Sequence, residues 1–322
     1  ALPPAASARR ARGELRAEMG GPSLKQRAWP LAAALILVSF AGFLTEVVAA
    51  SQMLSLAGST SLIYMYPLGG LGLLAVALLQ FRFVDHQARL PMLRAVGFGY
   101  AIAFAIALVF ISQSVWQVGA TGIVWLLADQ LNFLVPLLVW SLAGDEFNVA
   151  EGRKIFGWIV AWTYAGQLAG LAVSALAPTL MTPAGVPLWW LLAVDPVVCV
   201  IVALWLPRRL RGSAAGKGTA KEVGYGESLK GAWEFIEGVP VWKSLLIASI
   251  ITFAATMTAH LSFLGGLRDI LGTDAGTIQA VLGGVTLGVF VLSFAVQKLW
   301  AQKIQDRLGI PGTLMILPVM AV

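Results

Sequence analysis

The stretch WPLAAALILVSFAGFLTEVVAA, residues 29–50, decides the fold class of this chain. A helix needs roughly 20 apolar residues to cross the hydrocarbon core of a bilayer, and this run supplies them. Similar runs occupy residues 60–81, 93–112, 119–143, 155–177, 187–206, 242–265 and 276–298, and a ninth begins near Pro311. The sequence therefore predicts an all-α, polytopic membrane helix bundle.

The overall composition agrees with a membrane protein. Hydrophobic residues make up 58% of the chain and charged residues 12%, with a mean hydropathy of +0.82. Soluble domains carry about 25% charged residues, so a water-soluble globular domain is excluded. The pI near 9.7 would suggest a nucleic-acid partner in a soluble chain. Here the basic residues flank apolar runs, and we assign them to topology and to the anionic surface of a lipid bilayer.

The distribution of the 22 Lys and Arg residues predicts the orientation of the chain. All of them except Arg268 lie in or beside segments that fall on one side of the membrane when each apolar run spans it once. Basic loops resist translocation, so that side is the cytoplasmic one. We expect a multi-pass protein of the plasma (inner) membrane with a cytoplasmic N-terminus.

Four regions follow from this topology. Residues 1–28 form a basic cytoplasmic tail, and residues 29–206 form an N-terminal six-helix bundle. Residues 207–240 are a long, polar cytoplasmic linker with an amphipathic helix near its end. Residues 241–322 begin a C-terminal bundle of about two and a half helices, so we expect the second half to be truncated or partly absent in this chain.

A short charged motif follows both the second and the eighth spans. The first copy reads FRFVDHQARL at residues 81–90, and the second contains QKIQDRLG at residues 302–309. Acidic and basic side chains at such positions hold neighbouring helix ends together by charge-assisted hydrogen bonds, and we assign them gating or structural roles. The residues concerned are Asp85, Arg89, Asp306 and Arg307.

Six spans, a long basic connection and a DRxG turn resemble the major facilitator superfamily, whose signature is G-x-x-x-D-R-x-G; Gln302 stands at its leading glycine. The stretch at residues 140–170 is similar to the ATP/ADP-translocase-like branch. The superfamily resemblance implies a 6+6 pseudo-repeat in which helices 1, 4 and 7 face a central cavity. No Lys or Arg lies at mid-membrane, so the nucleotide substrate of that branch is not expected here.

Polar residues within the spans are the candidates for a binding site, because burying an unpaired charge in a membrane costs several kcal/mol. The fourth span carries Asp129, Gln130 and Asn132 near mid-bilayer. Helical spacing places Asp129 and Asn132 on one face with Trp125 and Pro136. We interpret the group as a substrate or proton site, with a structural cluster that bonds to a neighbouring helix as the alternative.

The first and seventh spans add further candidates. Glu46 is either a proton-coupling carboxylate or a group that reaches the outer water layer. Thr256 and His260 belong to a polar stripe on the seventh span, where histidine can change charge near neutral pH. Hydroxyl groups in such a stripe also bond to their own helix backbone, which is the structural alternative.

The fifth span is rich in small residues that favour close helix packing. Thr163 and Gln167 are its polar groups able to contact a substrate. Its small residues form two rows at helical spacing: Gly157, Ala161, Ala165 and Ala169 in one, and Gly166, Gly170 and Ser174 in the other.

Two further groups have structural or gating interpretations. Asp195 precedes Pro196 in the sixth span, where we expect it to stabilise a kink. Arg153 and Lys154 lie near acidic residues between the fourth and fifth spans, and we expect Arg153 to act as a gate. The alternative is an ordinary solvated flank, whose ion pairs contribute little to stability. The neighbouring acids, to which we assign no gating role, are Asp145, Glu146 and Glu151.

The favoured function is a secondary active transporter that moves a small solute by alternating access, with Asp129 or Glu46 as the proton-coupling acid. The alternative is a non-transporting structural or assembly subunit of a larger membrane complex, with partner membrane subunits. No catalytic motif stands out, Cys199 is the only cysteine, and no metal or cofactor site is expected. An enzyme is therefore not predicted.

Overall fold

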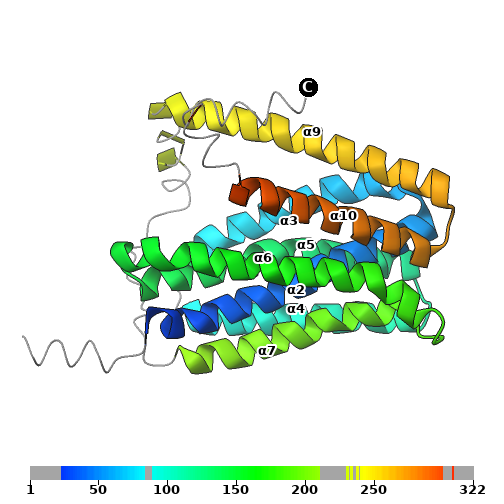
Figure 1. Cartoon of the computed structure of the whole chain (residues 1–322), viewed down its shortest axis with the longest axis horizontal. Coiled ribbons are helices and arrows are strands. Elements are labelled where there is room, and N and C mark those ends of the chain that lie inside the picture. Colours follow the sequence, from blue (N-terminus) through cyan, green and yellow to red (C-terminus); the bar gives the residue numbers. More distant parts are fainter. Residues whose placement is uncertain are drawn as a thin grey trace, which may run out of the picture.

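The computed structural model describes residues 23–83, 89–210 and 240–299, together with residues 230, 231, 233, 234, 237, 238 and 307. Within these residues the regular secondary structure is entirely helical (Figure 1). In this part of the chain eight helices are long and apolar enough to cross a membrane. These eight helices confirm the all-α class and correspond to the eight complete spans predicted from the sequence.

The helices run nearly parallel to one another along the long axis of the molecule (Figure 1). Their bounds are α2 Leu24–Ala57, α3 Ser59–Phe83, α4 Arg89–Ser112, α5 Gln117–Glu146, α6 Val149–Met181, the 3-10 helix η1 Leu188–Ala193, α7 Val194–Arg209, α9 Pro240–Leu271 and α10 Ala275–Leu299. The predicted basic tail, the linker helix and the ninth span lie wholly or mostly outside the described residues.

Local sequence signals set the helix ends. Asn148 starts α6 with a capping box, in which its side chain accepts a hydrogen bond from the backbone N–H of Glu151 at 2.9 Å. Gly58, with a φ of +83°, ends α2 in a conformation that favours glycine. Asp274 accepts hydrogen bonds from the Thr277 backbone N–H at 2.8 Å and its hydroxyl at 2.6 Å, and these bonds lower the pKa of the Asp274 carboxyl. The carboxylate therefore stays charged at neutral pH and caps α10.

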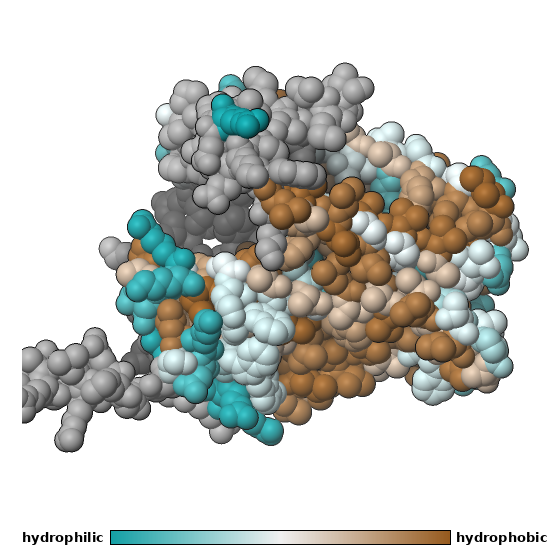
Figure 2. All heavy atoms as spheres, in the orientation of Figure 1, coloured by the Kyte–Doolittle hydropathy of each residue, from teal (hydrophilic) through white to brown (hydrophobic). Residues whose placement is uncertain are grey.

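Charge separates the two ends of the bundle. We call the end that carries Arg27, Arg89, Arg208 and Arg209 the basic end, and the end near Gly58 the opposite end. Figure 2 shows a large group of hydrophilic atoms at one end of the molecule, smaller hydrophilic patches at the other end and a broad hydrophobic surface between them. Such a surface is suited to lipid, because its backbone polar groups are satisfied within the helices.

The most buried helix is α2, which contacts α3, α5, α6, α7, α9 and α10. It is apolar around most of its circumference, as expected for a helix in the centre of a bundle. Many of its buried residues are alanines, including Ala28, Ala32, Ala34 and Ala41, and these allow neighbouring helices to approach closely.

Only one of the two small-residue rows on α6 packs against another helix. An ideal Cβ atom on Gly166 would lie 2.4 Å from the carbonyl oxygen of Ile36, and one on Gly170 would lie 2.3 Å from that of Phe40. Both glycines are buried, whereas Gly157 in the other row is exposed. The Gly166 row therefore fixes the close contact between α2 and α6.

Most of the helix contacts among the first six spans recur between the same pairs of helices when α2, α3 and α4 are exchanged with α5, α6 and α7, although the extents of the contacts differ. The first helices of the two units, α2 and α5, contact each other, and so do the third helices, α4 and α7. The α2–α6 contact corresponds to the α5–α3 contact. The α4–α5 contact corresponds to the α7–α2 contact. The α2–α6 contact is much more extensive than the α5–α3 contact, and the α2–α3 contact has no counterpart of similar extent between α5 and α6 in the described part of the chain. Because three spans separate equivalent helices, the two units have opposite orientations in the bundle.

The close α2–α6 contact predicts a large difference between two matched substitutions. Gly166→Ala places a methyl group against the backbone of α2 and should lower the free energy of unfolding by about 1–3 kcal/mol, the usual cost of overpacking. Gly157→Ala on the same helix meets nothing within 4 Å and should leave stability unchanged or slightly raised. Thermal unfolding of the purified variants in detergent measures both. Equal stability of the two variants would contradict the described packing.

Candidate functional site

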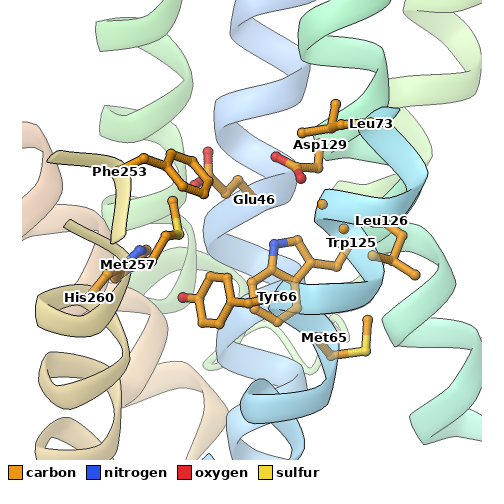
Figure 3. Close-up of a pocket in the computed structure, with 12 residues that line it drawn as sticks. Glu46, Met65, Tyr66, Leu73, Trp125, Leu126, Asp129, Phe253, Met257 and His260 are labelled. Carbon is orange, nitrogen blue, oxygen red and sulfur yellow. The ribbon is translucent and has the colours of Figure 1, made fainter. Parts of the chain in front are cut away.

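A cavity of about 130 Å³ lies between α2, α3, α5 and α9 (Figure 3). The predicted candidates Glu46, Asp129 and His260 all line it, although they come from three different helices. The remaining lining residues are Met65, Tyr66, Gly69, Gly70, Leu73, Trp125, Leu126, Phe253 and Met257. The wall formed by α3 was not predicted, because the resemblance implied only the first, fourth and seventh spans.

Glu46 and Asp129 lie at the same depth in the bundle. Glu46 lies 12 residues before Gly58 on α2, and Asp129 lies 12 residues after Gln117 on the antiparallel helix α5. At a rise of 1.5 Å per residue, each lies about 18 Å from the opposite end. The predicted mid-membrane acid of the fourth span is therefore level with a second acid.

The two carboxyl groups face the cavity with no compensating partner among the described residues. Glu46 is half-buried, and Asp129 is exposed to the cavity. The part of the chain that the structure describes places no hydrogen-bond donor, lysine or arginine in contact with either group. Negative charge in such a setting is stable only with a proton, a cation or water close by. The cavity is thus chemically suited to exchange protons or to hold a cation.

Glycines on α3 let the carboxyl group of Asp129 fit beside this helix. An ideal Cβ atom on Gly69 would lie 3.3 Å from the Asp129 Oδ2 atom, which is already a tight contact. On Gly70 the equivalent atom would meet nothing within 4 Å, since this residue faces open space at the cavity wall. The pair of glycines therefore widens the site next to the carboxylate.

Tyr66 is a site residue that the sequence did not reveal. Its ring packs edge-on against Trp125, with 5.6 Å between centroids, and lies 6.2 Å from the ring of His260. Its hydroxyl oxygen is buried and has no hydrogen-bond partner among the described residues. The sequence feature that could have pointed to Tyr66 is its position one helical turn before Gly69, which places both residues on one face of α3.

The other two candidates on α5 lie away from the cavity. The Gln130 side chain accepts a hydrogen bond from the Tyr100 hydroxyl at 3.5 Å and lies against Gly72 of α3. Asn132 packs against Gly42 of α2, where an ideal Cβ atom would overlap its side-chain oxygen. Both amides therefore occupy helix contacts, which was the structural alternative for these residues.

Two candidates on α6 also lie outside the cavity. The Thr163 hydroxyl donates a hydrogen bond to the carbonyl oxygen of Ile159 on its own helix at 3.0 Å. The side-chain oxygen of Gln167 is buried without a hydrogen-bond partner in the described part of the chain. The structure gives neither residue a place in the wall around Glu46 and Asp129.

On α9 the structure separates His260 from the rest of the predicted stripe. Phe253, Met257 and His260 face the cavity, at spacings of four and three residues. Thr256 is exposed and outside the cavity lining. The side of α9 that meets the cavity is thus mostly apolar and aromatic, with the imidazole as its polar group.

Asp195 is fully buried and joins α7 to α2. The Thr45 hydroxyl donates a hydrogen bond to its Oδ2 atom, while Oδ1 has no partner among the described residues. The sixth span changes from a 3-10 helix to α7 at Val194, so Pro196 lies in the first turn of α7, where a missing N–H is tolerated.

Ion pairs at the basic end involve the acids to which we had assigned no gating role from the sequence. Arg89 pairs with Asp145, and Arg27 bridges Glu146 at 3.2 Å and Glu151 at 2.9 Å. Arg89 also donates a hydrogen bond to the carbonyl oxygen of Ser141 at 2.9 Å. These contacts tie the ends of α2, α4, α5 and α6 together.

Among the described residues no ion pair supports a gate at Arg153 or Lys154. Both are exposed, and neither forms an ion pair with a described residue. The reason is the start of α6 at Val149, which directs Glu151 towards α2 and leaves the next two residues on the outer face. Arg307 is also exposed, and the predictions for Asp85 and Asp306 lie outside the described residues.

Comparisons of the chain with protein-family models, with curated proteins and with solved structures find no match. The function is therefore argued from the cavity and from the arrangement of the helices around it.

The buried bond between α2 and α7 can be tested by removing its donor. Thr45→Val leaves the Asp195 carboxyl group buried without a partner and should lower the free energy of unfolding by about 1–3 kcal/mol. Thr45→Ser keeps the hydroxyl and should retain most of the stability. Thermal unfolding in detergent compares the two, and a valine variant as stable as the serine variant would show that the bond contributes nothing.

Proposed function

We propose that this protein is a secondary active transporter of the facilitator type, which moves a small solute by alternating access and couples this movement to protons. The observation that carries the proposal is a pair of carboxyl groups, Glu46 and Asp129, that face one cavity at one depth and have no partner among the described residues. Ionisable residues inside a membrane are costly, and they commonly mark ion pathways and proton relays.

The helix arrangement supports the same class of protein. Many secondary transporters contain inverted repeats and place their binding site near the membrane midplane, between the repeats. Here α2 and α5 are the first helices of two inverted three-helix units, and each contributes one carboxyl group. We assign the chain to the major facilitator superfamily on this basis, with α9 and α10 as the first two helices of a second six-helix unit.

The orientation follows from the charges. We place the basic end in the cytoplasm and the chain in the plasma (inner) membrane, since arginine and lysine favour the inner side. At the opposite end the Ser55 hydroxyl donates to the carbonyl oxygen of Thr273 at 2.5 Å, and the Arg268 guanidinium lies against Gly58. Together these contacts support a state in which α2 and α9 are closed on the outer side.

Coupling to protons would use the carboxyl groups of the cavity as carriers. A proton or a positively charged solute can neutralise each of them, and alternating access would expose them to one side of the membrane at a time. A non-transporting subunit with the same fold would have no need for a cavity that opens to both sides. This difference separates the two classes experimentally.

The test uses the fact that the chain has a single cysteine, the buried Cys199. In a Cys199→Ala background, Gly70→Cys places a thiol at the cavity wall. We expect a membrane-impermeant maleimide to label it from either face of oriented, sealed vesicles, because the cavity opens to each side in turn. Mass spectrometry of the protein measures the labelled fraction.

Gly99→Cys is the matched control, because this glycine is exposed on α4, away from the cavity, and has nothing within 4 Å of an ideal Cβ atom. It should face lipid and stay unlabelled by a water-soluble reagent. Labelling of Gly70→Cys from one face only, at every pH, would contradict alternating access and favour the structural subunit.

A further inference from the structure

We propose that the solute is an organic cation with an aromatic or otherwise apolar body, held by Glu46 and Asp129 within an aromatic wall. This inference rests on the proposed function in one respect, namely that the cavity is the transport site. It names the chemical class of ligand, which transporter architecture alone does not define.

Charge is the first argument. Two carboxyl groups face the cavity, and no lysine or arginine is present among its described lining residues. An anionic solute would meet uncompensated negative charge, whereas a cation would be attracted to it. Phosphate and carboxylate ligands need arginine, lysine or clustered N–H donors, which the described lining does not provide.

The aromatic and sulfur-containing side chains distinguish an organic cation from a metal ion. The lining includes the rings of Tyr66, Trp125 and Phe253, and ring faces attract weakly hydrated cations. Met65 and Met257 add polarisable side chains that adapt to ligands of different shape. Calcium, by contrast, takes six to eight oxygen ligands, more than two carboxyl groups and one phenol offer.

The solvation of the lining agrees with this class. Tyr66 lines the cavity, and its buried hydroxyl has no hydrogen-bond partner among the described residues. A ligand with a positive centre and an apolar body would satisfy both the charges and the rings.

Binding of such a cation competes with protons. The titratable groups that face the cavity are Glu46 on α2, Tyr66 on α3, Asp129 on α5 and His260 on α9. A cation that binds beside a protonated carboxyl group displaces its proton into water, so that a positive charge enters and a proton leaves. Affinity for the cation should therefore fall as the pH is lowered.

The test uses two ions of nearly the same shape and opposite charge, tetraphenylphosphonium and tetraphenylborate, with the purified full chain in detergent. We expect saturable calorimetric binding of tetraphenylphosphonium that weakens at acidic pH, release of protons into a weakly buffered solution, and no saturable binding of tetraphenylborate. Equal binding of both ions would show partition into apolar surface and would overturn the proposal.

Variants locate the site. Glu46→Gln and Asp129→Asn should each weaken tetraphenylphosphonium binding at least tenfold, whereas Asp269→Asn, which removes an exposed carboxyl group outside the cavity, should leave it unchanged. Thermal unfolding checks that each variant folds. Should a cavity variant fail to fold, proton release by the wild-type protein still decides the question, since its absence overturns the proposal.

The outcomes for ligand class and for transport can be told apart. Absence of tetraphenylphosphonium binding, together with two-sided labelling of Gly70→Cys, would overturn the ligand class and leave the transporter standing. Specific binding with one-sided labelling would support the cation site while removing the transport function.

Discussion

A carboxylate within a membrane must be neutralised by a proton, paired with a cation or reached by water, because its transfer from water into hydrocarbon costs several kcal/mol. Glu46 and Asp129 face this constraint together, at one depth and in one cavity, without a described cation beside either. Two such groups lower the stability of the fold relative to apolar side chains, which would fill the same space at no electrostatic cost. Their chemistry, exchanging protons and attracting cations, is therefore the simplest physical reason for their presence.

The rest of the bundle positions these two groups. Gly166 and Gly170 bring α6 against the backbone of α2, and the Thr45–Asp195 hydrogen bond ties α2 to α7, so the helix that carries Glu46 is held on two sides. The inverted pairing of α2 with α5 sets the acids level with each other. On the remaining side, α9 makes fewer contacts and contributes aromatic and sulfur-containing side chains. The proposed alternating access would use this difference in packing, with α9 moving against the tightly packed helices.

The spans and their order could be predicted from the sequence, because apolar length and flanking charge are local properties of the chain. The family resemblance implied that the first, fourth and seventh spans face one cavity, and the structure brings Glu46, Asp129 and His260 from these spans to one cavity. Gln130, Asn132, Thr163 and Thr256 looked similar to them in sequence but meet other helices, their own backbone or the outside. Helices that are apolar nearly all round do not reveal which neighbour each face meets. For the same reason the sequence did not identify Tyr66 as a site residue or predict the Arg27 ion pairs. Both depend on contacts between distant segments.

Water access to the two carboxyl groups is the most direct point to test. Infrared difference spectroscopy of the protein in lipid, recorded as the pH is changed in H₂O and in D₂O, detects the C=O stretch of protonated carboxyl groups. We expect bands that titrate with the medium, that shift to lower frequency in D₂O, and that are lost in Glu46→Gln or in Asp129→Asn. Spectra in which neither substitution removes a titrating, exchangeable band would contradict the central claim that both carboxyl groups share a cavity reached by water.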